Sequence, residues 1–157
     1  MTDDIPAYIA ITRLQASYAD VVTRRAWAEL GPLFVPGATI HIDTVTRPPI
    51  EVVGAGALGE FIAGAIERFA FFEFVPLNTV VEVGPDGTAT GRLYMVELRQ
   101  ERDGGEWSNA FGLYQDRYRF DAGRWKFAHR HYQSLARKVG VQLAEVFPFP
   151  PPGEPVT

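Results

Sequence analysis

The spacing of hydrophobic residues in the first half of the chain predicts helices. Apolar residues recur every three or four positions from Ile5 to Arg24, and Pro6 suits the first turn of such a helix. A shorter helix is predicted from Ala26 to Phe34. A clearly amphipathic helix follows from Ala55, with an apolar stripe that ends at Phe69.

The second half of the chain alternates between apolar and polar positions, as strands do. Strands are predicted over 38–43, 74–83, 88–102, 106–120 and 124–135, and 44–53, which contains Pro48 and Pro49, is predicted to be a loop. Glycine-containing turns join the last four strands into an antiparallel meander. Long strands twist, so this meander should curl. The sequence therefore predicts an α+β fold, in which a curved antiparallel sheet forms a half-open cone and three N-terminal helices cover its concave face. The cone is expected to span 1–138, and 139–157 is expected to be a proline-rich tail.

Four segments resemble the SnoaL-like family of the nuclear transport factor 2-like superfamily. They are YADVVTRRAWAEL, LFVPGATIHID, NTVVEVGPDGTATGRLY and GLYQDRYRFDAGRWKFAHR, and they occur in the family's order. The superfamily includes scytalone dehydratase, bile acid dehydratase and ketosteroid isomerase, together with binding modules that are not enzymes. The resemblance implies the cone fold and a pocket for a small hydrophobic molecule, polycyclic or aromatic. The sequence has no glycine-rich phosphate loop, so no organic cofactor is expected.

The dehydratases of this family carry an Asp at the end of the first helix and a His at the start of the strand after the third helix. Here those positions are Thr23 and Phe74. The resemblance implies that both residues lie at the ligand pocket, without the acid and base of the Asp–His mechanism.

Two charged residues on a predicted strand are candidates for acid–base chemistry. Glu97 and Arg99 continue the apolar face of 89–101, so we expect them at one end of the cavity. A carboxylate beside apolar walls can act as a general base, and a guanidinium can hold an oxyanion. The alternative is a solvated ion pair at the end of a strand.

Other polar side chains are predicted to share this interior. Tyr18 on the first helix and Tyr114 on a strand could donate hydrogen bonds to a substrate, or could simply pack in the core. The resemblance also places Gly112 in the pocket. His129 and His131 alternate with Phe127, so they are expected to face inward, with His131 as a proton shuttle beside Glu97.

Composition excludes several classes of function. The chain of 157 residues has a net charge of −4 and contains no cysteine, so neither a nucleic-acid surface nor a thiolate metal site is expected. The histidines and aspartates show no compact spacing for a metal site, and the short apolar runs predict no membrane span, so we expect a cytoplasmic protein. Three functions remain open: a cofactor-independent lyase or isomerase, a non-catalytic ligand-binding module, or the small subunit of a ring-hydroxylating oxygenase-type complex. A homodimer through the outer sheet face, which carries Arg92, Tyr94, Val96 and Leu98, is expected.

Overall fold

One curved sheet and two helices make up most of the protein. The computed structural model describes residues 4–140; the proline-rich tail predicted for 139–157 lies almost wholly outside these described residues. The elements are α1 (Ile5–Arg24), η1 (Trp27–Glu29), η2 (Gly31–Leu33), β1 (Phe34–Asp43), β2 (Ile50–Val53), α2 (Ala55–Ile66), β3 (Phe69–Val83), β4 (Thr88–Glu101), β5 (Trp107–Asp121) and β6 (Arg124–Val139). Described helices include none that is long and apolar enough to cross a membrane.

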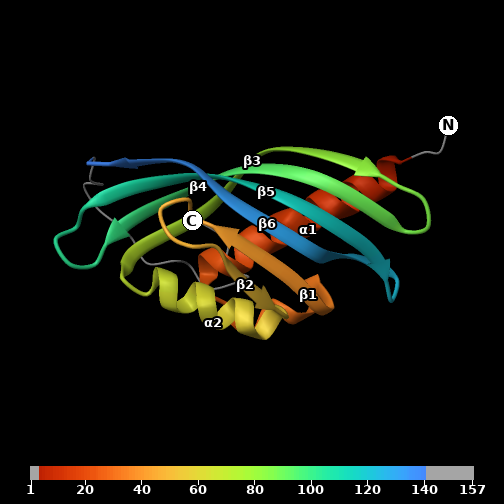
Figure 1. Ribbon diagram of the computed structural model, residues 1–157, viewed down its shortest axis with the longest axis horizontal. Coiled ribbons are helices and arrows are strands. Elements are labelled where there is room, and N and C mark those ends of the chain that lie inside the picture. The colour runs from red at the N-terminus through yellow and green to blue at the C-terminus, as the bar shows by residue number, and fades with distance from the viewer. Residues whose placement is uncertain (1–3, 141–157) are drawn as a thin grey trace, which may run out of the picture.

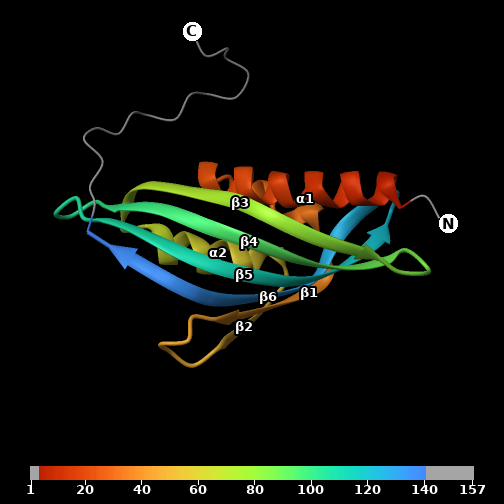
Figure 2. The same cartoon turned by 90° about the horizontal axis from the view of Figure 1, so that it is seen from above.

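The sheet has six strands in the order β2-β1-β6-β5-β4-β3. Neighbouring strands are antiparallel, except that β1 runs parallel to β6. The long strands bend along their length, and α1 and α2 lie on the inside of the bend (Figures 1 and 2). This arrangement is the half-open cone predicted from the sequence.

Helix α1 has the bounds that its apolar spacing predicts. Pro6 occupies its first turn, and Arg25 ends it in a left-handed conformation with φ of 58°. Its buried stripe includes Ile11, Leu14 and Tyr18. The helix packs on β3 and β6, so the Tyr18 ring is held against the inner face of the sheet.

The structure corrects five predicted boundaries. The helix predicted from Ala26 to Phe34 is two short 3-10 turns, because Pro32 lacks the N–H that a continuing helix needs. The predicted loop 44–53 includes β2, which pairs with β1. Strand β1 begins at Phe34 rather than at Ala38, and β3 begins at Phe69 rather than at Phe74. Strand β6 continues past Leu135 to Val139.

Strand β6 carries two irregularities that decide which side chains face inward. Across β5, Tyr118 pairs with Phe127 and Arg117 pairs with His129, so Ala128 is an extra residue. Leu135 is a second extra residue, between the pairs Gly112–Ser134 and Phe111–Ala136. Each such β-bulge shifts the alternation of faces by one residue. The inner face of β6 is therefore not the single row of odd positions predicted from the sequence.

Candidate functional site

A cavity opens between α2 and the inner face of the sheet. Its volume is about 190 Å³, and a sealed apolar cavity of roughly 150 Å³ is enough to hold benzene. Apolar residues of β1 and α2 form one wall, among them Ile40, Leu58, Phe61 and Ile62. The opposite wall is polar and is supplied by Tyr18, Glu97, Arg99, Tyr114, Tyr132, Ser134 and Arg137. The cavity thus combines an apolar wall with a few ionisable groups, as small-molecule sites do.

Glu97 and Arg99 lie side by side on β4 at this cavity. Arg99 Nη1 is 3.4 Å from Glu97 Oε2, and their side chains are only 13% and 21% exposed. Burial raises the pKa of the Glu97 carboxyl, and the charges of Arg99 and Arg137 only partly offset it. A glutamate with a raised pKa holds a proton closer to neutral pH than usual and can take or give one during a reaction.

Two tyrosine hydroxyls complete the inner end of the site. Tyr18 and Tyr114 are both buried, and their ring centroids are 6.3 Å apart in an edge-to-face arrangement. Burial raises the pKa of each hydroxyl, although the nearby Arg130 acts in the opposite direction. Both hydroxyls therefore stay protonated. The Tyr114 hydroxyl donates a hydrogen bond to that of Tyr18, which leaves the Tyr18 hydroxyl able to donate to an oxygen of a bound molecule.

Arg130 is fully buried behind these tyrosines, and the sequence interpretation missed it. Its guanidinium carbon lies 3.9 Å from the ring centroid of Tyr114 and 4.3 Å from that of Tyr18. Asp116 accepts two hydrogen bonds from it, from Nε at 2.8 Å and from Nη2 at 3.0 Å. Burial disfavours the cation, but Asp116 and the two tyrosines outweigh that effect and raise the pKa of Arg130. One sequence signal did exist: Asp116 follows Tyr114 by two residues and so shares its face of the predicted strand 106–120, where a buried acidic residue needs a cationic partner.

The Asp116 carboxylate also organises the side of the core away from the cavity. The hydroxyl of Tyr118 donates to Asp116 Oδ2 at 2.9 Å, and Gln15 Nε2 donates to the Tyr118 hydroxyl at 2.7 Å. This chain of hydrogen bonds ties α1 to β5 and β6 beneath the tyrosines. In this network the Asp116 carboxylate and the Tyr118 hydroxyl have partners, whereas Arg130 Nη1 is buried without a hydrogen-bond partner among the described residues. Buried hydrogen bonds of this kind hold the rings above them in one defined position.

Three predicted pocket residues lie on the inner side without lining the cavity. The Thr23 hydroxyl accepts a hydrogen bond of 3.0 Å from the backbone N–H of Phe74. The Phe74 ring packs edge-on against Tyr18, with a centroid separation of 5.6 Å. At Gly112 the space for a side chain is already filled by the Tyr132 ring and Met95. Gly112 thus makes room for Tyr132, which does line the cavity.

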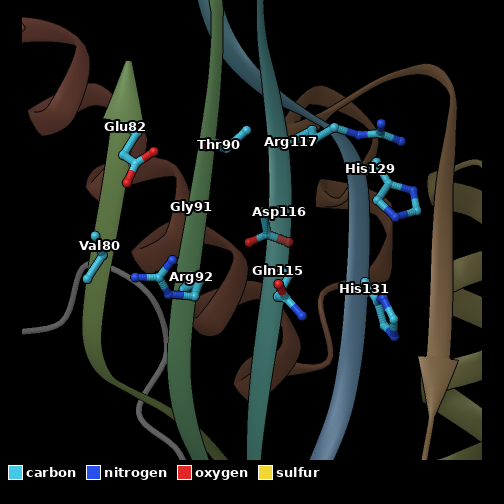
Figure 3. A pocket seen from close by; sticks show the side chains of 10 residues that line it. All are labelled: Val80, Glu82, Thr90, Gly91, Arg92, Gln115, Asp116, Arg117, His129 and His131. Carbon is cyan, nitrogen blue, oxygen red and sulfur yellow. The ribbon is translucent and has the colours of Figure 1, made fainter. Parts of the chain in front are cut away.

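The prediction that His129 and His131 face the cone interior is wrong. The bulge at Ala128 turns Arg130 inward and both histidines outward. Figure 3 shows the two histidines beside Arg117 and Gln115 at a separate hollow on the outer sheet face. Thr39 contacts His129 at 2.6 Å there, and the rings of His41 and His131 meet edge to face. His131 cannot share a proton with Glu97 across the sheet.

The outer hollow is the larger of the two, at about 310 Å³, but its strands present mainly exposed side chains such as Gln115 and Arg117. Within residues 4–140, no group of three or more histidine, aspartate or glutamate side chains is placed to hold a metal ion. The inner cavity therefore remains the better candidate, because burial and converging hydroxyl, carboxyl and guanidinium groups occur together there.

Comparison with known proteins gives a consistent picture of the fold. A family model described as a SnoaL-like domain matches residues 3–131. The crystal structure of a protein from Novosphingobium aromaticivorans, provisionally assigned as a scytalone dehydratase, superposes with a TM-score of 0.77 at 20% identity, covering 98% of this chain and 99% of that one. The crystal structure of hexachlorocyclohexane dehydrochlorinase LinA-type3 from Novosphingobium barchaimii LL02 superposes with a TM-score of 0.76 at 17% identity, covering 95% of this chain and 98% of that one. No curated protein sequence matches the chain.

Proposed function

The chain belongs to the SnoaL-like domain family, and from that premise we propose that it binds a small hydrophobic ring compound and acts on it as a cofactor-independent lyase or isomerase. The observation that carries this proposal is the half-buried Glu97 in an otherwise largely apolar cavity, close enough to Tyr18 and Tyr114 to influence their ionisation. Structurally similar proteins include ones named for dehydratase and dehydrochlorinase activities. Both names describe eliminations, and eliminations need a base.

The proposed reaction begins with proton transfer to Glu97. Its ionised carboxylate takes a proton from a substrate carbon next to a carbonyl group, and the C–H electron pair moves toward the carbonyl oxygen. Tyr18 donates a hydrogen bond to the oxygen as its negative charge grows, and Tyr114 strengthens that donor through its own hydrogen bond to Tyr18. The protonated Glu97 then returns the proton to another atom of the substrate, or to a leaving group, so charge and atoms balance.

Hydrogen–deuterium exchange tests the first step without knowledge of the natural substrate. β-Tetralone, an apolar bicyclic ketone, is incubated with the protein in heavy water, and loss of its α-proton signals is followed by NMR. Glu97→Gln keeps the size and hydrogen-bonding capacity of the side chain but cannot accept the proton. It should slow the protein-dependent exchange by about 10²- to 10⁴-fold, the usual contribution of a general base.

Arg92→Gln is the matched control, since it changes one charge on the outer face of the sheet, away from the cavity. This variant should promote exchange of the β-tetralone α-protons at the wild-type rate. Equal exchange rates in Glu97→Gln and wild type would show that Glu97 is not the general base and would refute the proposed enzymatic function.

A non-catalytic ligand-binding module is the second candidate, and a specific observation favours it. At the positions where related dehydratases are expected to carry the catalytic Asp and His, the chain has Thr23 and Phe74, which are joined by a hydrogen bond and have no ionisable side chain. A binding module would take up β-tetralone with unchanged affinity in Glu97→Gln and would show no protein-dependent exchange. Calorimetry shows whether β-tetralone binds, and the rate of protein-dependent exchange then separates the two functions.

A further inference from the structure

Three arginines surround the cavity and outnumber its acidic residues. Arg68, Arg99 and Arg137 all line it, and Glu97 is the one acidic side chain among the described lining residues. The full chain carries a net charge of −4. The excess of positive charge at this cavity therefore runs against the overall charge of the protein.

The available carboxylates do not neutralise these arginines. Arg68 meets Glu101 at 3.3 Å, but its side chain is 66% exposed, so this pair is weak. Arg99 meets Glu97 only at the long distance of 3.4 Å. The exposed side chain of Arg137 forms neither an ion pair nor a hydrogen bond with any residue of the described range 4–140. Burial lowers the pKa of Arg99; Glu97 opposes this effect, and the charges of Arg137 and Arg68 add to it.

The strand register shows where the unmatched charge lies. Glu97 pairs with Ala110 on β5, and Ala110 pairs with Arg137 on β6. Glu97 and Arg137 are thus two strand spacings apart, about 10 Å between backbones. All three residues line the cavity. The small methyl group of Ala110 lies between them, with Arg137 on its β6 side and Glu97 on its β4 side, and Arg99 is two residues further along β4.

We propose that the space beside Ala110 receives the anionic group of the ligand, so that the cavity takes an apolar ring bearing a carboxylate or a similar single anion. Arg137 and Arg99 donate hydrogen bonds to the anion, and the ring packs on the apolar wall of α2 that includes Phe61 and Ile62. The inference rests on the proposed function, because it assigns the substrate class of the same cavity. It requires that an anion bind more tightly than a neutral molecule with the same ring.

A pair of probes tests this requirement directly. Naphthoate and the neutral naphthalenemethanol share a ring system and differ in charge, and their affinities are measured by calorimetry at low salt. Naphthoate should bind the wild-type protein about tenfold or more tightly, the ratio expected from one charge-assisted hydrogen bond. Arg137→Gln should remove most of that ratio and leave naphthalenemethanol affinity within about twofold, while Arg137→Lys should keep part of it.

Arg92→Gln makes the same change in net charge on the outer face and should leave the ratio intact. The inference fails if wild type binds both probes equally, or if Arg92→Gln and Arg137→Gln reduce naphthoate binding alike, since that would reflect net charge alone. Neither of these outcomes contradicts the proposed function, because the ring compounds would still bind in the apolar cavity. If neither probe binds, the proposed ring-binding function and the inference both fail.

Discussion

Removing the charge of Asp116 should strongly destabilise the protein, because it leaves Arg130 buried without its counterion. Neither side chain is exposed, and the two are joined by hydrogen bonds of 2.8 Å and 3.0 Å. Asp116→Asn preserves the shape of the side chain and one acceptor oxygen, so it removes the charge together with at least one hydrogen bond that Arg130 or Tyr118 donates. Breaking a buried pair from one side costs about 3–5 kcal/mol.

That cost can be read as a shift in melting temperature. For a chain of this size, 1 kcal/mol corresponds to roughly 2–4 °C, so Asp116→Asn should melt about 6–20 °C below wild type. Thermal unfolding followed by circular dichroism measures the shift, and urea unfolding at fixed pH measures the change in free energy. The double variant Asp116→Asn/Arg130→Met has no buried unpaired charge and should recover a large part of the loss.

A surface ion pair provides the matched control. Lys126 and Asp121 also meet at 2.8 Å, but Asp121 is 38% exposed, so Asp121→Asn should leave the melting temperature nearly unchanged. The reasoning is refuted if Asp116→Asn costs less than about 1 kcal/mol, the upper range of an exposed pair. It is equally refuted if the double variant is less stable than Asp116→Asn.

Two further predictions concern residues at or beside the cavity. Gly112→Ala places a methyl group on the Tyr132 ring and 3.0 Å from Met95 Sδ, so unfolding in urea should show a loss of about 1–3 kcal/mol and calorimetry should show weaker ring binding. The raised pKa of Glu97 means that the folded protein holds this proton more tightly than the unfolded chain does. Ionising Glu97 therefore lowers the stability of the folded protein as pH rises from the pKa of Glu97 in the unfolded chain to its higher pKa in the folded protein. Glu97→Gln should be more stable than wild type above neutral pH and should lose that advantage near pH 4; an advantage that grows on acidification would contradict the raised pKa.

Local sequence signals were enough to predict most of the fold. Helix α1 ends at Arg24 as predicted, and turns such as Asp121 to Gly123 separate the long strands where glycine permits positive φ. The placement of Glu97 and Tyr114 on the inner face also followed from simple alternation, since no bulge separates them from the apolar positions that set the face. These features depend on residues near one another in the chain.

The composition of the inner face of β6 could not be predicted in the same way. Ala128 lies between Phe127 and His129 with no glycine or proline to mark a bulge. Alternation counted from Phe127 therefore selected His129 and His131 and passed over Arg130. At Leu135 a second unmarked bulge carries the inner face from Ser134 to Arg137.

The register of the sheet nevertheless contains the reason why the first bulge must exist. Asp116 is on the inner face of β5, and its cross-strand partner on β6 is Arg130. Without the extra residue at Ala128, β6 would present a histidine row to the interior, and the Asp116 carboxylate would lose the guanidinium that satisfies it. A buried carboxylate without a cation costs far more than the local disruption of one strand pair. Pairing with Asp116 therefore accounts for the position of Arg130 behind Tyr18 and Tyr114, and the same bulge places the histidines on the outer face. Glu97 is then the carboxylate available for acid–base chemistry among the described residues that line the cavity.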